Sequence, residues 1–250
     1  MHRQIGKLMT KGRSLMLACD QGFEHGPADF NLKNIDPEFI MELAEKGGFN
    51  AVILHNGIAE KYYHGFSRKV PLVVKLNGKT NIPKIEPLSA NVCSLKRAVQ
   101  LGADAVGFTL FVGSRYEREM YEQVSKIVEE AHDYGIPVIT WAYPRGEFVP
   151  NPRATGTLAH AARVCLELGA DFVKINYNGD FEGFKWVVKA AGKARVMVAG
   201  GNKVDDAEFL QKTKEVLDAG AVGIAVGRQV WQHAEPMKMI EAIKKVVFDE

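Results

Sequence analysis

The sequence lacks the apolar stretches that membrane and secreted proteins carry. No apolar run approaches the roughly 18 residues that a membrane-spanning helix needs, and no secretory leader pattern is present. Three cysteines, Cys19, Cys93 and Cys165, stand far apart. Cys19 and Cys165 lie in apolar runs, which are typical of reduced core residues. We therefore expect a cytoplasmic protein that does not enter a membrane.

An excess of charge is also missing, and so is a cluster of metal ligands. The 32 basic residues nearly balance the 30 acidic ones, for a net charge of +2, so the composition predicts no nucleic-acid or membrane-surface partner. Neither the cysteines nor the histidines follow metal-ligand spacing; these histidines are His55, His64, His132, His160 and His233. We expect no metal and no other cofactor.

What the chain does have is a regular alternation of short apolar runs and amphipathic stretches. The predicted strands are 15–19, 51–55, 72–76, 105–111, 137–142, 172–176, 196–199 and 223–226. The predicted helices are 37–46, 57–63, 95–101, 117–134, 157–168, 181–191, 206–219 and 237–248, and several end next to a glycine. A series of eight strand–helix units predicts a closed parallel barrel.

The length agrees with a single domain of this kind. A (β/α)8 TIM barrel commonly has about 250 residues, and no stretch resembles a linker, so residues 1–250 are assigned to one barrel. A doubly wound open sheet is the alternative, but no G-x-G-x-x-G motif follows the first strand. Three long loops, 22–34, 77–87 and 144–153, follow strands and are expected at the C-terminal face, where barrel active sites lie.

One predicted strand contains a lysine at a costly position. Alternate side chains of a strand point to opposite faces, so Lys174 and Asn176 face the barrel interior if Val173 and Ile175 face the helices. Burial disfavours the ammonium form, and a neutral lysine can form a Schiff base with a carbonyl. For this position alone, a lysine that reaches solvent or pairs with a carboxylate is the structural alternative.

Other polar residues share the inward faces and weigh against that alternative. The alternation places Lys75 and Asn77 on one inward face. The alternation also places Trp141 and Tyr143 on the inward face of their strand. Asp20 lies at the end of the first strand. A carboxylate, a phenol, amides and two lysines at the same end of a barrel are hard to explain as core groups. We predict a catalytic cluster there.

The last two predicted strands end in glycine. One continues as Ala199-Gly200-Gly201-Asn202-Lys203 and the other as Val226-Gly227-Arg228. Barrels often bind phosphate at these two loops, and glycine lets the backbone approach a ligand. The pair predicts a phosphate site, with ordinary turns as the alternative. His25 could act as an acid, shape its loop or offer its backbone to a phosphate, and Glu24 could be a base or a cap.

Five motifs occur in one order along nearly the whole chain. They are residues 18–30, residues 57–63, residues 75–80, the Trp-x-Tyr-Pro-Arg-Gly motif at 141–146, and the Lys174 strand with Gly179-Asp180. Together they resemble the archaeal-type class I fructose-1,6-bisphosphate aldolases. The resemblance implies reversible cleavage of fructose 1,6-bisphosphate to two triose phosphates, no cofactor, and a homo-oligomer, possibly a decamer.

The resemblance also implies roles at the matching positions. Lys174 matches the Schiff-base lysine, and Tyr143 matches the tyrosine that shuttles protons. Trp141 matches the tryptophan against the intermediate, and Asp20 matches the aspartate that handles the carbinolamine. The Gly200-Gly201 and Gly227-Arg228 loops match those that hold one phosphate. Further substrate contacts are expected at His25, Lys75, Asn77, Arg145, Ala199, Lys203 and Val226. The family commonly has histidine where this chain has Gln21, which puts a proton-transfer role in doubt at that position only.

Three other functions remain open from the sequence. A related synthase of the 2-amino-3,7-dideoxy-D-threo-hept-6-ulosonate type would use the same lysine and a Tyr-Pro-Arg-Gly motif, but Trp141 and residues 60–63 fit it less well. A non-catalytic phosphosugar-binding barrel would leave the inward polar groups without a use. A metal-dependent aldolase is disfavoured because the histidines do not cluster.

Overall fold

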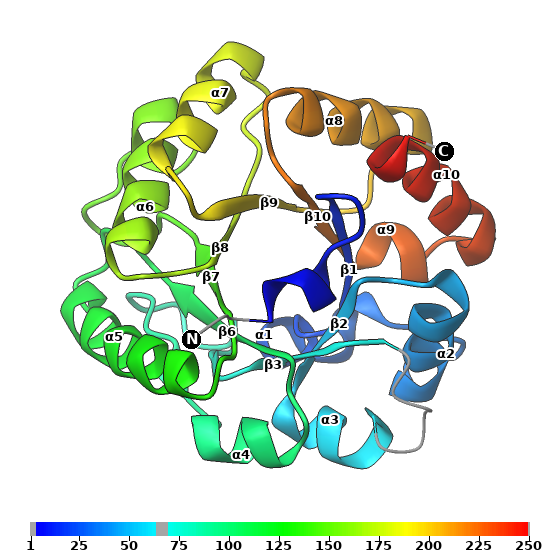
Figure 1. The fold of residues 1–250 in the computed structure, drawn as a ribbon, viewed down its shortest axis with the longest axis horizontal. Coiled ribbons are helices and arrows are strands. Elements are labelled where there is room, and N and C mark those ends of the chain that lie inside the picture. The colour runs from blue at the N-terminus through cyan, green and yellow to red at the C-terminus, as the bar shows by residue number, and fades with distance from the viewer. Residues whose placement is uncertain (1–3, 64–69, 250) are drawn as a thin grey trace.

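Eight parallel strands close into a barrel, as the sequence predicts. The computed structural model describes residues 4–63 and 70–249, so His64 lies outside the described residues. The barrel strands are β1 (Ser14–Ala18), β2 (Ala51–His55), β3 (Leu72–Lys75), β6 (Ala105–Leu110), β7 (Val138–Ala142), β8 (Phe172–Ile175), β9 (Arg195–Ala199) and β10 (Gly223–Val226). Their order around the barrel is β1-β10-β9-β8-β7-β6-β3-β2 (Figure 1). The predicted TIM barrel is confirmed.

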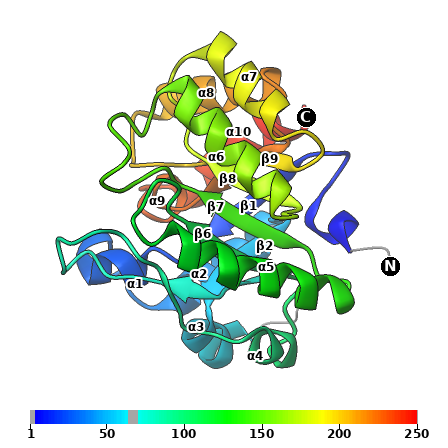
Figure 2. The ribbon, with the colours of Figure 1, turned by 90° about the vertical axis from the view of Figure 1, so that its left-hand side faces the viewer.

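A ring of helices covers the outside of the barrel (Figures 1 and 2). They are α2 (Pro37–Gly47), α3 (Asn56–Tyr62), α4 (Leu95–Gln100), α5 (Glu117–Asp133), α6 (Thr155–Glu167), α7 (Phe181–Ala190), α8 (Asp206–Asp218) and α10 (Pro236–Phe248). Each begins and ends within about two residues of its predicted bounds, the usual uncertainty of a helix end. No helix in the described part of the chain has the length and apolar character needed to cross a bilayer.

The first long helix shows how local sequence sets these bounds. At the start of α2, the Asp36 side chain accepts a hydrogen bond from the Glu38 N–H, and Pro37 occupies the first turn. The helix ends when Gly48 adopts a left-handed conformation, with φ of 63°. The predicted helix was 37–46, so α2 runs one residue further, through Gly47.

Six short elements were not predicted as regular structure. They are η1 (Ile5–Leu8), α1 (Gly22–His25), η2 (Gly26–Asp29), β4 (Asn77–Gly78), β5 (Ala90–Asn91) and α9 (Arg228–Trp231). Single turns show no hydrophobic period, so contacts with distant segments hold them instead. Trp231, for example, is buried, donates from Nε1 to the Ala18 carbonyl at 3.2 Å and stacks on Phe30.

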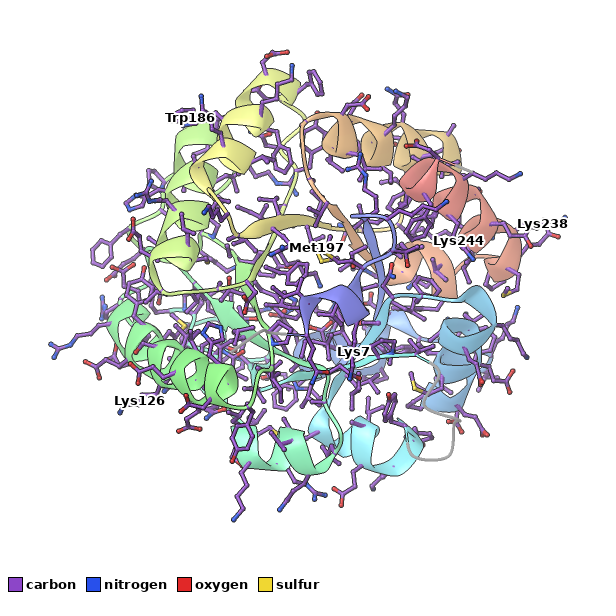
Figure 3. The ribbon with its side chains drawn as sticks, viewed as in Figure 1. Lys7, Lys126, Trp186, Met197, Lys238 and Lys244 are labelled. Atoms are coloured by element: carbon purple, nitrogen blue, oxygen red, sulfur yellow. The ribbon has the colours of Figure 1, made fainter. Side chains whose placement is uncertain are left out.

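The pleat of the strands separates two apolar layers. Inward side chains such as Met16, Phe172 and Met197 fill the barrel, and Met197 lies near its centre in Figure 3. Outward side chains such as Val173 pack under the helices. The segment η1 closes the N-terminal end, where Leu8 is fully buried against the inner layer. The opposite end, where the strands terminate, is left for a site.

Candidate active site

A cavity of about 330 Å³ opens at the C-terminal ends of the barrel strands. Most of the predicted site residues line it: Asp20, His25, Lys75, Trp141, Tyr143, Arg145, Lys174, Asn176, Ala199, Gly200, Gly201, Gly227 and Arg228. In a parallel barrel the carboxyl ends of all strands meet at one face, so residues far apart in the chain converge there. The predicted cluster therefore forms one continuous site.

Lys174 lies within β8 and is only 5% exposed. Burial lowers the pKa of Lys174 below its ordinary 10.5, while the Asp20 carboxylate opposes that shift. Its Nζ lies 4.7 Å from the centre of the Trp141 ring. Within residues 4–63 and 70–249, this Nζ has no hydrogen-bond or ion-pair partner. The amine is therefore available to attack a carbonyl carbon.

Lys75, at the end of β3, is the second buried lysine of the cavity. Burial lowers the pKa of Lys75 to about 8, with Asp20 acting in the opposite direction. Its Nζ donates to the backbone and side-chain oxygens of Asn77, at 2.9 and 3.2 Å. Because these acceptors hold the group and its pKa lies above 7, Lys75 is a largely charged and fixed ammonium at neutral pH. Lys174 is the better nucleophile.

Asp20 follows β1 and faces both lysines. Burial alone would raise the pKa of Asp20, but the charges of Lys174 and then Lys75 outweigh burial and hold the pKa below 3.8. The residue is therefore a carboxylate at neutral pH. A carboxylate between two amines can accept a proton from a group bound to either of them.

Tyr143 follows β7 and supplies the phenol. Burial, and then the charge of Asp20, raise the pKa of Tyr143 above its ordinary value of 10. The phenol therefore keeps its proton at neutral pH. A protonated phenol beside the carboxylate can donate a proton or a hydrogen bond to an oxygen that leaves or gains charge.

Gly107 of β6 provides the space that Trp141 occupies. A Cβ at position 107 would lie 2.3 Å from the Trp141 ring and 3.2 Å from Cδ of Lys75. The ring itself is 2% exposed and contacts both lysines. Sequence reasoning missed Gly107, although a glycine inside a strand often marks a close approach.

Two glycine loops lie side by side on the cavity wall. The Gly200 N–H donates to the Ala225 carbonyl at 2.9 Å, which joins the end of β9 to β10. Arg228 donates from Nη2 to the Gly201 carbonyl at 3.0 Å, so its guanidinium links the two loops. A guanidinium next to glycine backbone is suited to a phosphate group.

Asn77 was predicted to face the site, but the structure places it outside the cavity wall. The barrel strand ends at Lys75, and Asn77 belongs to β4, which pairs with β5. The inward–outward alternation therefore does not continue to this residue. Asn77 is fully buried, its Oδ1 accepts from the Thr109 N–H at 2.7 Å, and its Nδ2 donates to the Thr109 carbonyl at 2.9 Å. It holds Lys75 rather than lining the cavity.

Lys203 and Val226 also lie outside the wall of this cavity. Lys203 is exposed, and its Nζ donates to the Gln232 carbonyl at 3.1 Å. Val226 is fully buried, and its side chain packs in the outer apolar layer because it points away from the barrel interior. The cation of these loops that reaches the cavity is Arg228.

The loop after β1 contributes charged groups to the rim. His25 Nδ1 lies 2.6 Å from Oδ2 of Asp29. Glu24 pairs with Arg145 at 3.2 Å and lies 3.6 Å from Nζ of Lys79. Its carboxylate thus holds two cations at the mouth of the cavity, which agrees with the loop-capping interpretation better than with that of a free base.

Sequence reasoning missed His55 and gave Gln21 no positive role, yet both line the cavity. The signal for His55 was available, since Ala51, Ile53 and His55 alternate in a strand whose bounds were predicted correctly.

Within residues 4–63 and 70–249, no group of three His, Cys, Asp or Glu side chains is arranged to hold a metal ion.

Comparisons with known proteins give the family. The model of the DeoC/LacD family aldolases matches residues 14–233. The chain is 48% identical to "Fructose-bisphosphate aldolase class 1" of Thermoproteus tenax, over 95% of this chain and 90% of the relative. The corresponding protein of Halobacterium salinarum is 43% identical, over 96% and 92%.

Solved structures agree. A crystal structure of an archaeal fructose 1,6-bisphosphate aldolase superposes with a TM-score of 0.91 at 47% identity, over 96% of this chain and 95% of that one. A second archaeal structure, with its catalytic lysine covalently bound to the carbinolamine intermediate, gives a TM-score of 0.90 at 47% identity, over 95% and 94%. The chain belongs to the DeoC/LacD aldolase family.

Proposed function

We propose that the protein is a class I fructose-bisphosphate aldolase that uses Lys174 to form a Schiff base. The observation that carries this proposal is a buried lysine with a lowered pKa and an unengaged amine, facing a cavity with a carboxylate and a protonated phenol. The names of the archaeal relatives support the same reaction and a phosphorylated sugar as substrate.

The first half of the reaction forms the iminium. Neutral Lys174 attacks the C2 ketone of fructose 1,6-bisphosphate, and the oxygen of the resulting carbinolamine gains a proton from Tyr143. The Asp20 carboxylate accepts one of the two protons on nitrogen and passes it to the C2 hydroxyl, which leaves as water while nitrogen forms the C=N bond and keeps its other proton. Tyr143 is left as a phenolate. The positively charged C=N group at C2 is now adjacent to C3, so it can accept the electron pair of the C3–C4 bond when that bond breaks.

The second half breaks the C3–C4 bond. The Tyr143 phenolate accepts the proton of the C4 hydroxyl, the C4 oxygen forms a carbonyl, and the C3–C4 electron pair moves toward the iminium to give an enamine. Glyceraldehyde 3-phosphate departs, and Tyr143 passes its proton to C3 of the enamine. Water then hydrolyses the iminium to dihydroxyacetone phosphate and free neutral Lys174, and the proton released returns to Tyr143. The iminium accepts the electron pair, so these steps use no metal.

The test is borohydride trapping. Incubation with dihydroxyacetone phosphate, reduction and peptide mass spectrometry are expected to locate a stable adduct on Lys174. An adduct on Lys75 would keep the reaction class but refute the assignment of the nucleophile. No adduct with phosphate affinity intact would favour a binding protein or a metal-dependent enzyme. Turnover assays with fructose 1,6-bisphosphate and with the substrates of the heptulosonate synthase distinguish the aldolase from that synthase, since both would form an adduct on Lys174.

The lowered pKa of Lys174 predicts how trapping depends on pH. Only the neutral amine attacks, and lowering the pKa makes that form available at lower pH. The initial rate of adduct formation should therefore rise with pH and level off below 10.5, the ordinary lysine pKa. Reduction rates of a free lysine derivative with the same ketone serve as the reference, and a profile that keeps rising to 10.5 would contradict the assigned burial effect.

The packing of Trp141 predicts a large effect from a small change on β6. Gly107→Ala adds a methyl group at 2.3 Å from the ring, so Trp141 and the adjoining lysines must shift. Misplacement of this kind is expected to lower kcat/KM by about 10²-fold. Gly57→Ala is the matched control, because a Cβ at position 57 would meet no atom of residues 4–63 and 70–249 within 4 Å. Equal activities of the two variants would contradict the role given to Gly107.

We also propose that the protein assembles as a homo-oligomer, with the decamer that the family resemblance implies as the expected form, in the cytoplasm and without nucleic-acid or membrane partners. Large apolar side chains that are exposed in the single chain support assembly; they include Leu32, Ile82, Ile85, Phe148 and Trp186. In Figure 3, Trp186 points outward from α7. Light scattering after gel filtration measures the assembly, and a single-chain mass at micromolar concentration would refute it.

A further inference from the structure

Two buried side-chain nitrogen atoms in the cavity have no hydrogen-bond partner among residues 4–63 and 70–249. They are Nδ1 of His55 and Nε2 of Gln21, and both side chains line the cavity. His55 is only 8% exposed, so solvent does not replace the missing partner easily. Buried polar groups without partners cost free energy. Two of them in one cavity indicate a ligand that supplies the partners.

The imidazole of His55 is held at a defined position. It ends β2, in register with Lys75 of β3, and its ring packs against Phe23 with ring centres 4.8 Å apart. Gly78 leaves room for this pair, since a Cβ there would lie 2.9 Å from the Phe23 ring and 3.2 Å from Cε1 of His55. A side chain fixed in this way is suited to recognising one ligand group in one geometry.

The chemistry of the two side chains favours an uncharged ligand group. Burial, and then the charge of Lys75, lower the pKa of His55 to about 4, against the charge of Asp20 and the backbone groups of Asp20 and Lys75. The ring is therefore neutral at pH 7, with one nitrogen that donates and one that accepts, and the Gln21 amide is neutral too. A hydroxyl group both donates and accepts, whereas a phosphate would prefer cations such as Arg228.

The strand order places His55 across the barrel from Lys174. From β8, four steps in either direction around the closed sheet lead to β2. If Lys174 holds C2 and the loops after β9 and β10 hold the nearer phosphate, the part of the sugar beyond C3 extends toward β2. That part becomes the aldehyde product, and it carries one hydroxyl, on C5, that takes no part in bond cleavage.

We propose that His55 and Gln21 form a subsite that hydrogen-bonds the C5 hydroxyl of the open-chain sugar, which is the C2 hydroxyl of the aldehyde. This inference rests on the proposed aldolase function and adds a determinant of aldehyde specificity. In the direction of synthesis, the subsite selects aldehydes that carry a hydroxyl next to the carbonyl.

The test compares two aldehydes in condensation with dihydroxyacetone phosphate. One is glyceraldehyde 3-phosphate, and the other is 3-oxopropyl phosphate, which lacks the C2 hydroxyl. The wild-type protein is expected to prefer the first by at least about tenfold in kcat/KM, because a polar subsite rejects a ligand that leaves it unpaired. His55→Leu should bring this preference to within about twofold of unity, and His55→Gln should keep most of it. His160→Leu, on the exposed face of α6, is the control.

The preference is a ratio, so a general loss of active protein does not change it. An unchanged ratio in His55→Leu would overturn the proposal. An equal fall in kcat/KM with both aldehydes, together with loss of the dihydroxyacetone phosphate adduct, would also overturn the proposal. His55 would then affect adduct formation at Lys174 and not recognition of the aldehyde. A wild-type protein that forms neither an adduct nor a condensation product would refute the proposed function itself, before any His55 variant is compared.

Discussion

Lys174→Met is expected to abolish cleavage of fructose 1,6-bisphosphate, with a fall in kcat of at least roughly 10⁴-fold. Methionine is unbranched and flexible, so it can fill most of the space of the buried lysine stem without a nucleophile. No covalent intermediate can then form at position 174. Coupled detection of triose phosphate measures turnover, and borohydride trapping of the variant should yield no adduct.

The matched variant is Lys75→Met, which also removes a buried lysine from the cavity. Because Lys75 is held by Asn77 and stays largely charged at neutral pH, its loss should weaken turnover while leaving a trappable adduct on Lys174. A reversed result, with the adduct lost in Lys75→Met and kept in Lys174→Met, would transfer the nucleophile to β3. Circular dichroism of both variants checks that the barrel is intact.

Tyr143→Phe should lower kcat by about 10²- to 10⁴-fold, the range typical of a lost general acid or base. The change removes the phenol and leaves the ring, which packs against both apolar layers. The nucleophile remains, so the variant should still bind dihydroxyacetone phosphate and accumulate adduct on Lys174 more slowly. Exchange of the C3 proton of dihydroxyacetone phosphate with deuterated water, followed by NMR, measures the enamine protonation step directly.

Tyr121→Phe is the control for this phenol. Tyr121 lies on α5, outside the cavity, and donates to Glu117 at 3.0 Å. Loss of its hydroxyl should leave both turnover and proton exchange unchanged. Proton exchange in Tyr143→Phe at the wild-type rate would contradict the proposed proton transfer and point to Asp20 or a bound water instead.

Much of the fold could be predicted because it depends on local patterns. Short apolar runs marked every barrel strand to within about one residue, and capping groups such as Asp36 marked helix starts. The alternation of side-chain direction within a strand placed Lys174 on the inner face between Val173 and Ile175. The inner and outer apolar layers of the structure agree with that assignment.

The alternation failed where a strand stopped. Asn77 was expected beside Lys75 on an inward face, but β3 ends first and Asn77 pairs with a distant segment. His55 was overlooked although its strand was correct, because histidine was judged only by metal-ligand spacing. The error at Asn77 arises because strand ends depend on which segments pair, and pairing is not a local property of the sequence.

The sequence by itself determined the succession of strands and helices, the inward direction of Lys75, Trp141 and Lys174 in their strands, and the family to which the ordered motifs belong. Only the tertiary structure decided which of the two buried lysines has an unengaged amine, which loop cation reaches the cavity, and that His55 faces Lys174 across the barrel. Local periodicity specifies direction within one strand. Partners and distances arise when the eight strands close, because closure brings together residues that the chain separates by more than a hundred positions.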